Sequence, residues 1–104
     1  MAIKIPYDGR EYILDFNRNT VRQMEKNGFV VNTDAPLSMV TDLFRGAFMM
    51  HHRQVKPDKI EEIWDAQKGK DKLLAKLVSM YTKPLEDLMG EKEEEDENPT
   101  WEEV

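Results

Sequence analysis

The chain contains no cysteine among its 104 residues. This absence excludes disulfide bonds, thiolate metal sites and a cysteine nucleophile. Long apolar runs are also missing, since the longest, residues 47–50, is far shorter than a membrane span. Residues 1–6 show no apolar core of a signal peptide. We therefore expect a soluble, cytoplasmic, single-domain protein that has no membrane partner.

The charge of the chain is concentrated near one end. The sequence has 15 basic and 21 acidic residues, a formal charge of −6. Residues 91–104 alone hold eight acidic residues against one lysine, so the remainder is almost neutral. A near-neutral body argues against nucleic-acid binding, which needs a clustered basic surface. We expect one folded domain over residues 1–90 and a disordered acidic tail over residues 91–104.

The first 16 residues have the pattern of a β-hairpin. Apolar residues alternate at positions 3, 5 and 7 and again at positions 12, 14 and 16. Asp8-Gly9 lies between the two runs, and this dipeptide tolerates the positive φ of a tight turn. Pro6 lacks an N–H donor, which places its strand at an edge. The pattern predicts a hairpin over residues 2–16 that packs on the rest of the fold.

The rest of the body has helical spacing. A first helix is predicted over residues 18–27, capped by Asn17 or by Thr20 with Gln23, and ended by Gly28. A second is predicted from Pro36 to about residues 53–55, and a glycine at position 46 would allow another element to pack closely against it. Its apolar stripe comprises Leu37, Val40, Leu43, Phe44, Ala47, Phe48 and His51.

Two or three further helices complete the prediction. One begins at Pro57 and ends before Gly69, and the next begins with Asp71 as its cap. Pro84 either interrupts that helix or opens a short fifth one carrying Leu85, Leu88 and Met89. The expected fold is mainly α, a small bundle of four or five helices, with α+β character at the N-terminal hairpin. The expected core residues are Leu43, Phe44, Phe48, Trp64 and Leu77.

No set of side chains has the spacing of a catalytic or metal site. His51 and His52 are adjacent, so on a helix they point about 100° apart, whereas a helical zinc pair is spaced by four residues. We expect no enzyme activity, no metal and no cofactor. The seven methionines leave two interpretations open. They fill gaps in a small core, or they form an adaptable binding surface, for which Met39, Met49 and Met50 are the candidates.

Three stretches of the sequence resemble a known family. They are DFNRNTVRQMEKNGF (15–29), LFRGAFMMHH (43–52) and LLAKLVSMY (73–81), the last followed by Pro84-Leu85. They are similar to the small tail assembly chaperones of long-tailed, siphovirus-type bacteriophages and prophages. The resemblance implies a nonenzymatic protein that binds the tape measure protein and keeps it soluble while the tail tube assembles. It also implies a longer frameshifted product that recruits the tail tube protein.

The resemblance further places the protein in the cytoplasm of the bacterial host and outside the mature virion. Self-association remains open. The alternative interpretation is a small nonenzymatic regulatory adaptor that uses its acidic tail against a basic partner.

Overall fold

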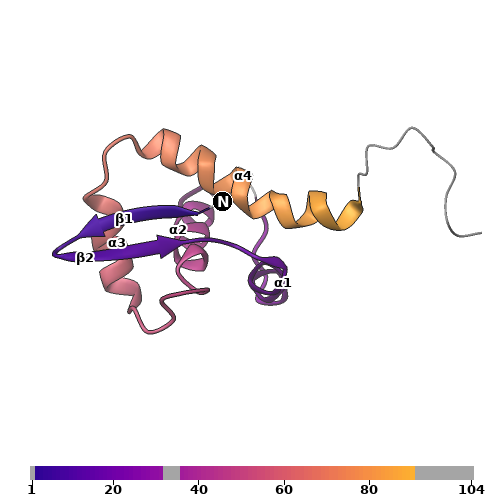
Figure 1. Cartoon of the computed structure of the whole chain (residues 1–104), viewed down its shortest axis with the longest axis horizontal. Coiled ribbons are helices and arrows are strands. Elements are labelled where there is room, and N and C mark those ends of the chain that lie inside the picture. The colour runs from indigo at the N-terminus through magenta and orange to yellow at the C-terminus, as the bar shows by residue number, and fades with distance from the viewer. Residues whose placement is uncertain (1, 32–35, 91–104) are drawn as a thin grey trace, which may run out of the picture.

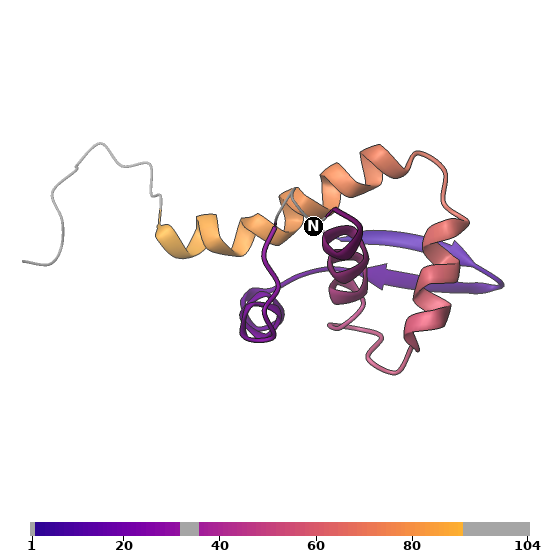
Figure 2. The same ribbon diagram turned by 180° about the vertical axis from the view of Figure 1, so that it is seen from behind.

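The computed structural model describes residues 2–31 and 36–90 (Figures 1 and 2). A two-stranded antiparallel sheet is followed by four helices in this part of the chain. Their bounds are β1 Ile3–Tyr7, β2 Arg10–Leu14, α1 Arg18–Lys26, α2 Pro36–Ala47, α3 Pro57–Asp65 and α4 Lys70–Met89. The prediction of a mainly helical fold with an N-terminal hairpin is confirmed. Within the described residues, no helix has the length and apolar character that crossing a membrane requires.

The hairpin has the predicted turn. Ile3 pairs with Leu14 and Tyr7 pairs with Arg10, so two residues connect the strands. Those residues, Asp8 and Gly9, have φ angles of 52° and 79°. Positive φ at both positions matches the right-handed twist of the strands, which is why this dipeptide suits the turn.

Helix α2 occupies the centre of the fold. It contacts α1, α3 and α4, and it lies against one face of the hairpin (Figures 1 and 2). Of the predicted core residues, Leu43, Phe44, Phe48 and Leu77 are buried. Trp64 is only half-buried, and its ring packs edge-on against Phe44 with the ring centroids 4.9 Å apart. Helix α2 and Phe48 thus contribute to a core that the hairpin, α1, α3 and α4 also supply with buried apolar residues.

The second helix is shorter than predicted. It ends at Ala47 instead of residues 53–55. The Ala47 carbonyl accepts a hydrogen bond from the backbone N–H of Asp15 at 3.1 Å, so the β2–α1 connection takes an acceptor that a longer helix would use. The backbone N–H groups of Phe48 and Met49 donate to the carbonyls of Arg45 and Gly46, three residues earlier, which tightens the last turn. Phe48 stays buried beyond the helix end.

The predicted start of α1 after Asn17 is confirmed, whereas the predicted cap of α4 is wrong. Asn17 caps α1 and pairs reciprocally with Thr20, which is the third helical residue, so Gln23 takes no part in this capping box. Helix α4 begins at Lys70 after Gly69, and Asp71 lies inside its first turn rather than at the cap. Gly69 has a φ of 67°, a conformation that glycine adopts without a Cβ clash.

A single helix covers the region of Pro84. Helix α4 continues through this residue to Met89, so the structure has no separate fifth helix there. The acidic tail predicted at residues 91–104 lies outside the described residues, as do residues 32–35.

Candidate binding surfaces

An apolar groove runs between α2 and α3. Its walls come from one face of each helix, with α2 residues spaced three or four apart. The groove encloses about 190 Å³. Its lining residues are Leu37, Val40, Thr41, Phe44, Arg45, Ile60, Glu61, Trp64 and Asp65.

The apolar residues of this α2–α3 groove differ sharply in exposure. Phe44 and Ile60 are buried and Trp64 is half-buried, so they form an apolar floor. Leu37, by contrast, is 82% exposed at the start of α2. The polar residues of the groove, which include Arg45 and two acids of α3, supply a rim. A groove with an aromatic floor, an exposed leucine and a polar rim is suited to an amphipathic helix.

The end of α4 is a second exposed apolar region. This part of the helix extends beyond the body of the molecule (Figures 1 and 2). Leu85, Leu88 and Met89 are each more than half exposed there. Among the described residues, no element covers them, which leaves one face of α4 unpartnered.

The three candidate methionines do not line the α2–α3 groove. Met39, Met49 and Met50 are all half-buried. Met39 and Met49 pack against the core, whereas Met50 lines two hollows beside the hairpin and beside α4. Leu37, which does line the groove, was predicted from its spacing to belong to the core stripe of the second helix. Its exposure follows from its place in the first turn, ahead of the turns that meet the hairpin and α4.

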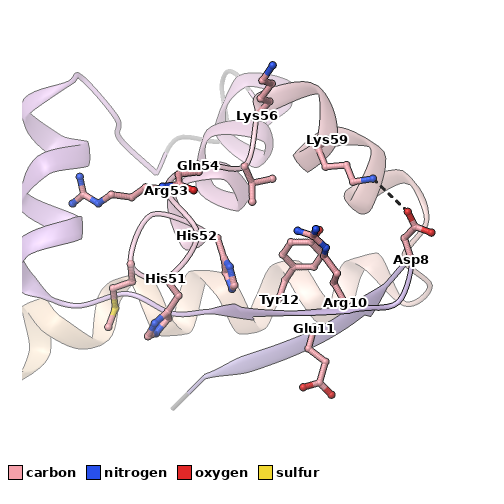
Figure 3. Close-up of a pocket in the computed structure, with 12 residues that line it drawn as sticks. Asp8, Arg10, Glu11, Tyr12, His51, His52, Arg53, Gln54, Lys56 and Lys59 are labelled. Carbon is pink, nitrogen blue, oxygen red and sulfur yellow. Dashed lines mark ion pairs between the residues drawn. The ribbon is translucent and has the colours of Figure 1, made fainter.

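A larger cleft lies between the hairpin and the α2–α3 connection (Figure 3). It encloses about 1100 Å³. His52 faces Tyr12 across it, with the ring centroids 5.3 Å apart. The His52 Nε2 accepts a hydrogen bond from the backbone N–H of Ile13 at 2.8 Å, which requires an unprotonated Nε2. Burial, and secondarily the charge of His51, lower the pKa of His52.

A contact of Tyr7, the last residue of β1, fixes the hairpin on α3. The Tyr7 hydroxyl donates to Oε2 of Glu62 at 2.5 Å. This hydrogen bond raises the pKa of Tyr7 to about 12 and lowers the pKa of Glu62. The Lys59 ammonium lies 5.2 Å from the centre of the Tyr7 ring. The hairpin turn is thereby held beside the first turn of α3.

The histidine pair does not form a metal site in the described part of the chain. His51 is exposed and His52 is engaged with the backbone of β2. No group of three histidine, aspartate or glutamate side chains in residues 2–31 and 36–90 is arranged to hold a metal ion. What the geometry offers is surfaces for binding: one apolar groove, one exposed helix face and one charged cleft.

Comparisons with known proteins place the chain in a family. No curated protein and no solved structure gives a significant match. Over residues 1–103 the chain matches the family described as a domain of unknown function, DUF5055, and it belongs to that family.

Proposed function

We propose that this protein is a nonenzymatic binding protein whose α2–α3 groove receives an apolar helix of a partner. The observation that carries the proposal is Leu37, 82% exposed beside a floor that contains Phe44 and Trp64. An exposed leucine next to an aromatic floor gains burial when a partner helix covers both. The half-buried methionines Met49 and Met50 remain a second contact region in this proposal because their flexible side chains adapt to different partners.

The proposed partner is the tape measure protein of a long-tailed phage or prophage. The support is the resemblance of residues 15–29, 43–52 and 73–81 to tail assembly chaperones. A long helical client with apolar stretches aggregates unless its apolar faces are covered, and a groove for apolar helices would cover them. The chain would act in the bacterial cytoplasm, and the tail tube protein would join through a longer frameshifted product.

Co-expression with the tape measure protein from the same genome tests this proposal. We expect the wild-type chain to keep the client soluble and to co-purify with it. Leu37→Asp should sharply reduce both, because a charge in a dry interface is costly whereas an exposed one is not. Val30→Asp is the matched control, since Val30 is 65% exposed and lies outside the groove. A paired Met49→Lys and Met50→Lys variant probes the second contact region.

The possible outcomes separate the alternatives. Client solubility that is equal for wild type and Leu37→Asp, with both folded, would show that the α2–α3 groove is the wrong surface. A wild-type chain that never binds the client would contradict the chaperone proposal. The regulatory adaptor then becomes the better interpretation, and charge reversal of residues 91–104 should abolish its binding to a basic partner.

A further inference from the structure

The cleft between the hairpin and the α2–α3 connection carries an excess of positive charge. Four basic side chains line it, against two acidic ones (Figure 3). They are Arg10, Arg53, Lys56 and Lys59 against Asp8 and Glu11.

Neighbouring acidic residues neutralise one of the four bases, Lys59. The Lys59 ammonium lies 3.8 Å from the Asp8 carboxylate and 3.5 Å from the Glu62 carboxylate. Glu11 points away from the cleft and lies 3.9 Å from Lys4 instead (Figure 3). Within residues 2–31 and 36–90, Arg10, Arg53 and Lys56 form no ion pair. Arg10 lies on the same strand as Tyr12, and the side chains of Arg53 and Lys56 extend outward from the rim of the cleft (Figure 3).

The chain itself contains a segment of complementary charge. Residues 91–97 are acidic at six of seven positions, and two more glutamates follow at positions 102 and 103. We propose that this basic cleft binds the acidic segment 91–104 of a second copy of the chain. The proposal concerns a different surface from the α2–α3 groove and does not depend on the client.

The arrangement of α3 and α4 favours a second copy over the same chain. The Lys70 ammonium donates to the carbonyls of Asp65 and Gln67, so α4 begins at the end of α3 that is remote from the cleft. Helix α4 then continues for 20 residues, about 30 Å at 1.5 Å per residue, and ends on the far side of the molecule from the hairpin turn (Figure 1). A segment that follows Gly90 would have to span the molecule to reach its own cleft. A segment from a second copy has no such constraint.

The contact would be heterologous, because the acidic segment of one copy meets the cleft of the next. Two copies that exchange segments reciprocally form a dimer, and copies that bind in series form a ring or an open chain. The association would be weak and strongly dependent on salt, since exposed charges are screened within about 10 Å at 0.1 M ionic strength.

Intermolecular paramagnetic relaxation measures this contact directly. The chain lacks cysteine, so Asn98→Cys provides a single spin-label site without a change of charge. Full-length chain that carries the spin label but no ¹⁵N is mixed with full-length chain that carries ¹⁵N but no spin label. We expect broadening of the amides of Arg10, Arg53 and Lys56 that grows with protein concentration. It should disappear at about 1 M salt, where the screening length is ~3 Å.

Charge reversal supplies the control and the rescue. Reversing Arg10, Arg53 and Lys56 to Glu should weaken the association about tenfold, as expected for several exposed ion pairs. The matched control reverses Lys68, Lys72 and Lys76, which are also exposed and lie outside the cleft, and it should leave the broadening intact. Labelled chains with Glu93, Glu94 and Glu95 changed to Lys should bind the reversed cleft and not the wild-type one.

Three results would overturn the proposal. Broadening that appears only when label and ¹⁵N are on the same chain would assign the segment to its own cleft. Uniform broadening over the whole surface, or none at all, would exclude docking in the cleft. If the cleft variant and the Lys68, Lys72 and Lys76 control lose the broadening equally, the association depends on the net charge of the chain and not on the cleft.

Discussion

At the scale of single residues, Phe48 tests the description of the core. Its side chain is 1% exposed, and its ring packs against Phe44 and Tyr12 with centroid separations of 5.2 and 5.8 Å. Phe48→Ala should lower the free energy of unfolding by ~3–5 kcal/mol, through lost burial and the cavity that remains. Chemical denaturation measures this change.

Leu37→Ala is the control for that prediction. Leu37 is also a large apolar residue, but its exposure means that truncation should change stability by less than about 0.5 kcal/mol. Similar denaturation midpoints for Phe48→Ala and wild type, with equal slopes, would show that Phe48 does not hold the core together.

His52 predicts how stability depends on pH. Its pKa in the folded protein lies below the ordinary value of 6.5, because the ring is half-buried against Tyr12 and Phe48 and lies beside His51. The unfolded chain therefore binds a proton as the pH falls through about 6.5, before the folded protein does. Stability should decrease as the pH falls below that value and level off below the folded pKa.

Thermal unfolding at several pH values between about 7 and 5.5 checks this, because the window spans the ordinary histidine pKa and lies above most carboxyl pKa values. His52→Gln should remove most of the decrease, whereas His51→Gln should keep most of it, because burial of His52 lowers its pKa more than the charge of His51 does. The same pH dependence in wild type and His52→Gln would contradict the assignment.

At the scale of secondary-structure elements, Gly46 controls how closely α1 packs on α2. A Cβ at this position would overlap the Sδ and Cε atoms of Met24, which is buried on α1. Gly46→Ala should improve helix propensity by ~1 kcal/mol, yet displace a packed side chain at a cost of ~1–3 kcal/mol. We therefore expect net destabilisation in the wild-type background.

The sign should change when Met24 is truncated. In a Met24→Ala background the overlap is gone, so Gly46→Ala should be neutral or stabilising by up to ~1 kcal/mol. A double-mutant cycle from urea denaturation measures the coupling. Additive effects of the two substitutions would show that the two residues do not compete for this space.

Local signals in the sequence predicted those elements whose limits are set locally. The hairpin turn depends on Asp8 and Gly9 alone, and α1 ends where Gly28 follows it. The end of α2 could not be predicted in this way, because it depends on a hydrogen bond from Asp15, a residue 32 positions away. Pro84 shows the opposite case, in which a residue that usually breaks helices lies inside one.

The candidate site was less predictable than the fold. Periodicity assigns Leu37 and Phe44 to the same stripe of α2, yet Leu37 is exposed and Phe44 is buried. The difference arises because Leu37 lies in the first turn of α2, whereas Phe44 lies in a later turn where its ring packs against Phe48 and Trp64. The basic cleft joins residues 8–12 with residues 50–59, and no spacing rule connects segments so far apart.

At the scale of the whole molecule, the protein presents surfaces of different chemistry in different places. The α2–α3 groove is apolar, the cleft beside the hairpin turn is basic, and the exposed end of α4 is apolar again. An apolar client and a charged neighbouring copy could therefore bind at the same time without competing.

The central claim is that the α2–α3 groove receives an apolar helix. The most direct test is an NMR titration in which the isotope-labelled full-length chain is mixed with a helical segment of the tape measure protein. The account predicts that the largest shifts fall on the methyl groups of Leu37 and Val40 and on the indole of Trp64, and that Leu37→Asp abolishes them. Shifts that instead cluster around the basic cleft would contradict this claim. An absence of shifts, at client concentrations at which the wild-type chain keeps the client soluble, would contradict it as well.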